Sequence, residues 1–135
     1  MYRVLLLDDE PNILSALRRS LAEIDAEDLD GDALHVETFT SPEVAIERSD
    51  EQDFDLVISD YRMPSMNGVE FLSRIMELQP SAPRMIISGW ADRDAIIAAV
   101  NEVHLARFLE KPWDDKALRD AVVSVLGNRG GQRRV

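Results

Sequence analysis

The sequence predicts an α/β domain with a five-stranded parallel sheet, doubly wound, in which helices on both faces give a three-layer sandwich. Two observations predict this class. Strand-like and helix-like segments alternate five times along the 135 residues, and most strand-like segments are continuous apolar runs, as expected for strands buried on both faces. The chain length fits one domain with a core of its own.

The first unit begins with the apolar run VLLL. Residues 3–8 are predicted to form a strand, and a helix opens at Asn12. The apolar residues of this helix fall on one face, at Ile13, Leu14, Leu17, Leu21 and Ile24. The acidic segment that follows, residues 25–34, is predicted to be a solvated loop.

The second and third strands follow the same pattern. Residues 35–40 form the second predicted strand. Ser41 then supplies a hydroxyl for a helix N-cap and Pro42 a proline at the first helical position, so a helix is predicted from there to about Asp50. The third strand, DLVISD (residues 55–60), ends in an acid.

The fourth strand lies between two further helices. A loop, YRMPSMNG, leads into a helix from Val69 to Leu78, and Pro80 stops this helix because proline cannot continue it. RMIIS, residues 84–88, is the fourth strand. Asp92 is predicted to cap the next helix.

The last unit closes the domain. RFLE, residues 107–110, is the fifth strand, Asp114 starts the last helix, and Gly127 is predicted to end it. The remaining stretch, NRGGQRRV, is basic and rich in glycine. We therefore expect one domain over residues 1–127 and a flexible basic tail or linker over residues 128–135.

The composition excludes several classes of protein. The chain has no cysteine, so it has neither a disulfide framework nor a thiolate metal site. A formal net charge of -11 argues against direct nucleic-acid binding, because phosphate backbones favour lysine and arginine. The apolar start is too short for a signal peptide, and no segment approaches the roughly 20 apolar residues of a membrane span. We expect a cytoplasmic protein without a membrane partner.

Reactive side chains follow four of the predicted strands. Asp8 and Asp9 come at the end of the first strand, Asp60 ends the third and Ser88 ends the fourth. Lys111 comes directly after the fifth. Ligands of open parallel sheets bind beyond the carboxyl ends of the strands, so we expect these five side chains to meet at one edge of the sheet.

Such a group of side chains suits phosphoryl transfer. Clustered carboxylates repel one another, and Mg²⁺ relieves that repulsion while preferring carboxylate, water and phosphate oxygens as ligands. An aspartate can act as the nucleophile toward a phosphoryl group. The transfer is helped mainly by positioning and by neutralising charge on the phosphoryl oxygens, for which a lysine and a small hydroxyl are suited.

Four motifs on these strand ends resemble a known family. DDE after the first strand, DYRMPSMNG after the third, SG after the fourth and KP after the fifth are similar to the response-regulator receiver domain of two-component signal transduction. The resemblance covers residues 3–126, in order and with family-like spacing. It implies a flavodoxin-like (βα)5 fold and assigns residues 1–127 to the receiver domain.

The resemblance implies a metal site and a phosphoacceptor. Asp60 would be the phosphoacceptor and also a metal ligand. Asp9 would bind Mg²⁺ directly, Asp8 would act on the metal through water, and the backbone carbonyl of Arg62 would complete the protein ligands.

The resemblance also implies a switch. Lys111 would contact the phosphoryl group, with its peptide bond to Pro112 in the cis form. Ser88 would donate its hydroxyl to a phosphoryl oxygen, and Phe108 would be the aromatic switch residue. Gly68 and Gly89 match small residues of the family beside the acceptor loop and the switch hydroxyl.

The function implied is that of a phosphorylation-dependent signalling receiver. A histidine kinase or phosphotransfer protein would phosphorylate Asp60, and the face formed by the fourth helix, fifth strand and fifth helix would then contact an output domain, a partner protein or a second copy in a homodimer. The chain would not be an enzyme in the ordinary sense, although it would assist its own phosphorylation and slow self-dephosphorylation.

Other interpretations stay open. The same fold can act as a phosphorylation-independent protein-interaction module. Asp8 and Asp9 alone would fit a helix N-terminal pair, and Phe108 alone would fit a core aromatic. Arg62 and Trp90 flank the predicted site, where they would either shield the phosphoryl group from water or, for Trp90, pack on the fourth helix.

The output pathway has weaker signals. The segment NEVHLARFLEKPWDD resembles receivers attached to signalling enzymes, such as cyclic-di-GMP phosphodiesterases or hybrid kinases. No helix-turn-helix or catalytic domain follows residue 126, so the chain is expected to be a stand-alone receiver or the N-terminal part of a longer regulator.

Overall fold

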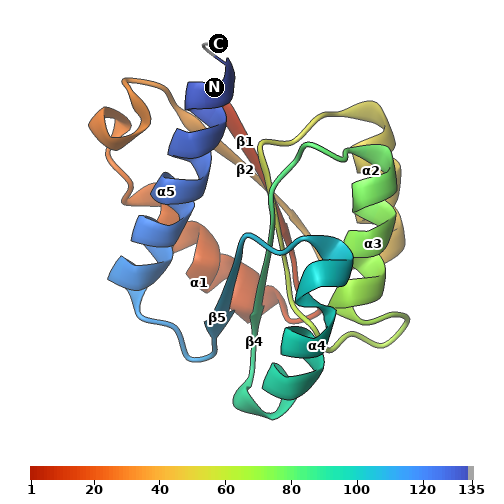
Figure 1. Ribbon diagram of the computed structural model, residues 1–135. Helices are drawn as coiled ribbons and strands as arrows, with labels where there is room; N and C mark the ends of the chain where they lie inside the picture. Colours follow the sequence, from red (N-terminus) through yellow and green to blue (C-terminus); the bar gives the residue numbers. More distant parts are fainter. Residues whose placement is uncertain (134–135) are drawn as a thin grey trace.

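The computed structural model describes the backbone of residues 1–133 and the side chains of residues 1–127. Over these residues the chain forms a five-stranded parallel sheet with the order β2-β1-β3-β4-β5 (Figure 1), which confirms the predicted fold class. The strands are β1 (Tyr2–Leu7), β2 (Leu34–Phe39), β3 (Leu56–Ser59), β4 (Arg84–Ser88) and β5 (Arg107–Glu110). The helices are α1 (Pro11–Ala22), α2 (Pro42–Glu51), α3 (Gly68–Leu78), α4 (Arg93–Val103) and α5 (Asp115–Arg133), with short 3-10 turns η1 (Ala26–Leu29) and η2 (Trp90–Asp92).

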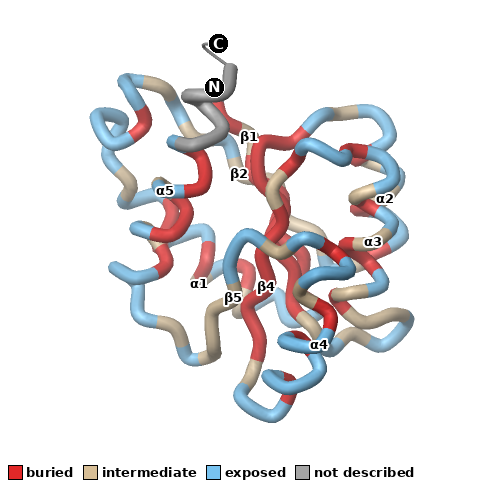
Figure 2. Tube along the Cα trace, in the orientation of Figure 1, coloured by how far each residue is buried: buried red, intermediate tan, exposed pale blue. Residues whose placement is uncertain are grey.

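Helices cover both faces of the sheet. α1 and α5 lie together on one face, and α2, α3 and α4 lie on the other (Figure 1). Side chains of β1 alternate between the two cores, because Val4 and Leu6 pack with α1 and α5 whereas Leu5 and Leu7 pack on the opposite side. The inner strands β1, β3 and β4 are largely buried, the edge strands β2 and β5 are only partly buried, and the outer sides of the helices are exposed (Figure 2). β1 is therefore covered on both sides, which accounts for its continuous apolar run.

Side-chain caps define several helix starts. Ser41 accepts a hydrogen bond from the backbone N–H three residues later at 3.4 Å, as predicted for the start of α2. Asp114 does the same at 2.8 Å before α5. α3 begins at Gly68, one residue before the predicted start, because Asn67 and Glu70 form a reciprocal capping box there.

The predicted end of the last helix is wrong. α5 does not stop at Gly127 but continues to Arg133. Glycine ends a helix mainly by adopting the left-handed conformation, and Gly127 does not adopt it. Residues 128–133 of the predicted tail are therefore helical in their backbone, and residues 134–135 lie outside the described part of the chain.

The acidic segment after α1 is only partly a solvated loop. Residues Ala26–Leu29 form the 3-10 turn η1, and Leu29 is buried in the core beside α1 and α5. Asp30 and Gly31 then turn the chain with positive φ angles of 57° and 83°. One apolar residue thus anchors a segment whose other side chains are mostly exposed.

Candidate functional site

Strand register brings the predicted carboxylates together. Leu7 of β1 pairs with Ser59 of β3, so Asp8 and Asp60 follow directly paired residues at the same edge of the sheet. Asp8 and Asp60 are buried, whereas Asp9 is exposed. One carboxylate oxygen from each of the three lies within 4.8 Å of the others. The expected convergence of these acids therefore holds in the structure.

Lys111 reaches into the same cluster from the end of β5. Its Nζ lies 2.8 Å from Oδ2 of Asp8 and 3.4 Å from Oδ1 of Asp60. Its backbone N–H donates to the carbonyl of Ser88 at 2.8 Å, which ties the start of the β5–α5 loop to the end of β4. The peptide bond between Lys111 and Pro112 is cis, as predicted.

The cluster perturbs two of its own groups. Burial raises the pKa of the Asp60 carboxyl, and the charge of Asp8 raises it further, while Lys111 and the backbone N–H of Tyr61 act in the opposite direction. Burial opposes the charge on Lys111, yet its hydrogen bond to Asp8 and the charges of both acids outweigh burial, and the pKa of the lysine is raised. The ammonium group therefore stays protonated beside the two buried acids.

The loop between β3 and α3 leaves no room for a side chain at Gly68. A Cβ atom there would lie 2.3 Å from the backbone carbonyl oxygen of Asp60. The Gly68 N–H donates to the carbonyl of Tyr61 at 2.7 Å, which closes the loop. The observed path of this loop thus depends on a glycine at position 68.

The hydroxyl of Ser88 has a partner that was not predicted. Ser88 is buried and its Oγ donates to Oδ2 of Asp92 at 3.0 Å. Nε of Arg62 donates to Oδ1 of the same carboxylate at 2.7 Å. Within the described residues the Asp92 side chain makes no capping hydrogen bond to α4, so the prediction that it caps this helix is wrong. Asp92 does hold the position directly before α4. η2 runs directly into α4, and Asp92 has the right-handed helical backbone rather than the extended form typical of an N-cap.

The other predicted switch positions lie around this network. Phe108 is partly buried against the core beneath α2, α3 and α4. A Cβ atom on Gly89 would meet nothing within 4 Å among the described residues. Trp90 is 66% exposed, and the guanidinium carbon of Arg93 lies 4.9 Å from its ring centroid. Trp90 therefore contacts the start of α4 while most of its ring faces solvent.

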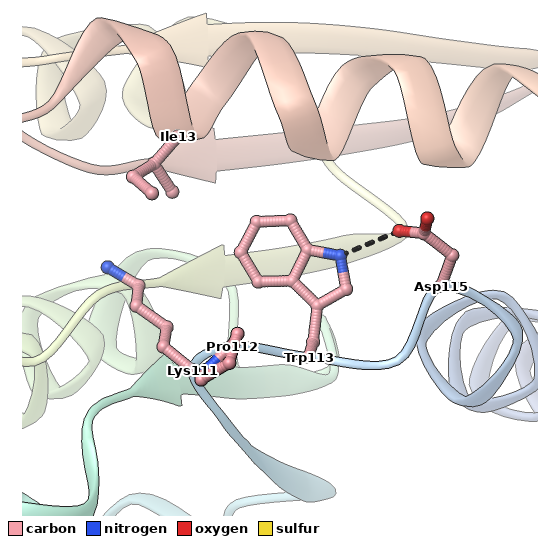
Figure 3. A pocket seen from close by; sticks show the side chains of 5 residues that line it. All are labelled: Ile13, Lys111, Pro112, Trp113 and Asp115. Carbon is pink, nitrogen blue, oxygen red and sulfur yellow. Dashed lines mark hydrogen bonds between the residues drawn. The ribbon is translucent and has the colours of Figure 1, made fainter.

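A pocket of about 460 Å³ opens beside Lys111 (Figure 3). Ile13 of α1 faces Trp113 and Lys111 across it, and Pro112 and Asp115 complete the lining. The indole N–H of Trp113 donates to Oδ1 of Asp115 at 3.0 Å, which holds the ring at the pocket wall (Figure 3). An apolar surface thus adjoins the lysine of the acidic cluster.

The donor set fits Mg²⁺. This cation prefers oxygen ligands and is commonly held by one or two carboxylates, with its other positions open to water and phosphate oxygens. Asp8, Asp9 and Asp60 offer three carboxylates, and the exposed position of Asp9 leaves the cluster open to solvent.

Comparison with known proteins decides the family. Residues 4–123 match the response regulator receiver domain. The chain belongs to this family. Receiver domains generally bind Mg²⁺ at an acidic pocket, and this receiver domain has an acidic cluster at Asp8, Asp9 and Asp60.

Relatives and solved structures agree with this assignment. The receiver domain is 36% identical to the hydrogenase transcriptional regulatory protein HoxA of Cupriavidus necator, over 98% of this chain and 26% of that protein. It is 34% identical to the C4-dicarboxylate transport transcriptional regulatory protein DctD of Pseudomonas aeruginosa, over 92% and 25%. The signal receiver domain of an HD domain-containing protein from Pseudomonas fluorescens Pf-5 superposes with a TM-score of 0.84 at 29% identity, covering 98% of this chain and 92% of that one.

The receiver domain thus spans about a quarter of the length of these curated relatives. Among its described residues, no helix combines the length and apolar character that a membrane span requires. The general function of the family is phosphorylation-dependent signalling within two-component systems.

Proposed function

We propose that this receiver domain accepts a phosphoryl group on Asp60 from a histidine kinase or phosphotransfer protein of the cytoplasm. The observation that carries the proposal is the placement of Asp60 beside two further carboxylates and the ammonium group of Lys111. Asp60 is a buried acid with an anion and a cation beside it, at an edge of the sheet that is open to solvent. These surroundings suit a nucleophile, because the phosphorylated aspartate carries more negative charge than the free aspartate.

The chemistry follows from these groups. An oxygen of the Asp60 carboxylate attacks phosphorus, the phosphorus–nitrogen bond to the donor histidine breaks, and its electron pair returns to the imidazole. Lys111, 3.4 Å from Asp60, neutralises charge on the phosphoryl oxygens. Asp9, Asp60 and the Arg62 carbonyl would hold Mg²⁺ directly and Asp8 would hold it through water; when bound, the ion neutralises further phosphoryl charge.

The output of the proposed switch is a change of surface. The Ser88 hydroxyl would turn to a phosphoryl oxygen, and Phe108 would move from a partly exposed to a more buried position. The surface formed by α4, β5 and α5 would then bind an output domain, a partner protein or a second copy of the chain. Slow self-dephosphorylation at Asp60 would reset it. The sequence similarity to HoxA and DctD supports an output in transcriptional regulation through a further domain or partner.

Labelling of the purified protein tests the proposal. The wild-type protein should take up a phosphoryl group from a small-molecule phosphodonor, and should bind beryllium fluoride, only when Mg²⁺ is present. Failure of both reactions in a folded protein would instead favour the phosphorylation-independent interaction module.

A further inference from the structure

One buried carboxylate joins the two loops on either side of the proposed phosphorylation site. Asp92 is 5% exposed, and both of its oxygens accept hydrogen bonds. Oδ2 accepts from the hydroxyl of Ser88 at 3.0 Å, and Oδ1 accepts from Nε of Arg62 at 2.7 Å. Arg62 belongs to the loop after Asp60, and Ser88 ends β4, so a single side chain connects both loops.

The Ser88 hydroxyl cannot serve two acceptors at once. A serine hydroxyl has one proton to donate. In this structure that proton is directed to Asp92, whereas the function proposed above requires it at a phosphoryl oxygen on Asp60. Phosphorylation must therefore break the bond between Ser88 and Asp92, which is charge-assisted and stronger than a bond between neutral groups.

We propose that Asp92 is a positioning residue that holds the Ser88 hydroxyl in the unphosphorylated state and so opposes the switch. Arg62 sets how strongly it does so. While Arg62 is bound, Asp92 keeps a cationic partner after Ser88 leaves. Without Arg62, the departure of Ser88 would leave a buried carboxylate with neither partner, which is strongly unfavourable.

The position of Asp92 in the fold links this contact to α4. Asp92 directly precedes α4, so release of its bond to Ser88 loosens the N-terminal end of that helix. The other end of α4 is held separately, because Nε of the buried Arg84 donates to the carbonyl of Val103 at 2.7 Å. The helix is therefore placed to move at the end nearer the phosphorylation site while its far end stays attached.

Opposite effects of two substitutions test the proposal. Beryllium fluoride is titrated into the whole chain in the presence of Mg²⁺, and bound fluoride is measured by fluorine NMR. Asp92→Asn should bind roughly tenfold more tightly than wild type, because the bond that Ser88 must break loses its charge. Arg62→Gln should bind several-fold more weakly, because Asp92 then depends on Ser88 alone. A purely structural role would move both variants in the same direction.

The double variant separates this account from a direct effect of charge. In the Asp92→Asn background, Arg62→Gln should cause no further weakening, because its effect acts through Asp92. Arg93→Gln is the matched control: this arginine lies beside Trp90 at the start of α4, and its loss should change binding less than twofold. Equal weakening by Arg62→Gln in both backgrounds, or the same direction of change in both single variants, would overturn the proposal.

Failure of the role proposed for Asp92 can be distinguished from failure of the proposed function. If wild type fails to bind beryllium fluoride, the phosphorylation function itself is wrong. If wild type binds and the variants do not shift in opposite directions, only the role of Asp92 is wrong. Should Asp92→Asn prove unfolded by circular dichroism, Arg62→Gln and its Arg93→Gln control decide the question, since the Arg62 side chain is 73% exposed; weaker binding by Arg62→Gln alone supports the proposal and unchanged binding overturns it.

Discussion

Asp60 lies in surroundings that disfavour its charge. Burial and the neighbouring carboxylate of Asp8 raise its pKa, and Lys111 offsets only part of their effect. A carboxyl whose folded pKa is raised adds stability below its unfolded pKa and loses that stability as pH rises through the folded value. The negative charge of Asp60 is thus disfavoured by its surroundings, and a bound cation, or a phosphoryl group together with its metal, would offset this cost.

Asp60→Asn should abolish labelling by a phosphodonor and by beryllium fluoride, because it removes the anionic nucleophile while keeping the shape. Without Mg²⁺ the variant should unfold at the same or a higher denaturant concentration than wild type at neutral pH, since a disfavoured buried charge is gone. Mass spectrometry and chemical denaturation measure the two effects. Stoichiometric labelling of this variant would remove Asp60 from its proposed role.

Arg62 and Trp90 should lengthen the lifetime of the phosphorylated protein. Both are large side chains beside the site, and together they could keep water from the phosphoryl group. Trp90→Ala and Arg62→Ala should each speed the loss of phosphate. This loss is measured as the release of inorganic phosphate from the labelled protein. If neither does, Trp90 serves to pack against α4 through Arg93, which lies over its ring.

At the scale of single elements, residues at the ends of strands and helices make the contacts that connect one element to another. The β3–α3 loop closes only because Gly68 lies against the backbone of Asp60. The β4 strand begins with the buried Arg84, whose guanidinium donates to three carbonyls, those of Ala82, Pro80 and Val103. That side chain joins the end of α4 to the loop after α3, at the opposite edge of the sheet from the acidic cluster.

Gly68→Ala should disturb the proposed phosphoacceptor, Asp60, directly. The new Cβ would lie 2.3 Å from the Asp60 carbonyl oxygen, so the backbone of the β3–α3 loop must move. We expect slower phosphorylation and weaker beryllium fluoride binding, measured side by side with the control Gly89→Ala. A Cβ at Gly89 meets no described atom within 4 Å, so that variant should keep its fold. Equal behaviour of the two would show that the close approach at Gly68 has no effect on the site.

Arg84→Met should lower the free energy of unfolding by about 2–4 kcal/mol, because it leaves buried carbonyls without their charged donor. Arg107→Met is the matched control on the neighbouring strand, where the side chain is exposed, and should change stability by less than about 0.5 kcal/mol. Urea denaturation measures both. A similar loss in the two variants would mean that the carbonyl contacts of Arg84 add little stability.

At the scale of the whole molecule, topology places the site. The order β2-β1-β3-β4-β5 puts β1 and β3 side by side, while α1 lies on one face of the sheet and α3 on the other. The chain therefore diverges where β1 and β3 end, and crevices of this kind are where parallel sheets bind ligands. Asp8, Asp9 and Asp60 occupy that position.

Mg²⁺ should stabilise the whole domain. An ion that binds the folded acidic cluster and not the unfolded chain raises the thermal midpoint with its concentration. Asp9→Ala should lose most of this shift and also fail to be phosphorylated. The control Asp94→Ala removes an exposed acid on α4 and should keep the shift. A normal Mg²⁺ response of Asp9→Ala in thermal denaturation would exclude Asp9 as a ligand.

The sequence alone predicted most elements of the fold and part of the site. Continuous apolar runs, period-3.6 helices and residues such as Ser41 act locally, so they predicted the strands, the helix order and several boundaries. The convergence of Asp8, Asp60 and Lys111 was also predictable, because every parallel strand delivers its last residue to the same edge of the sheet.

The contacts between loops were not predictable from the sequence and became visible in the tertiary structure. Asp92 has partners at the end of β4 and in the loop after β3, and Arg84 has partners at the end of α4 and in the loop after α3. Sequence spacing does not specify such meetings, because they depend on how loops of irregular shape are held against one another. The continuation of α5 past Gly127 has a similar cause: glycine permits either a helical or a left-handed backbone, and the choice between them is made by the surrounding structure.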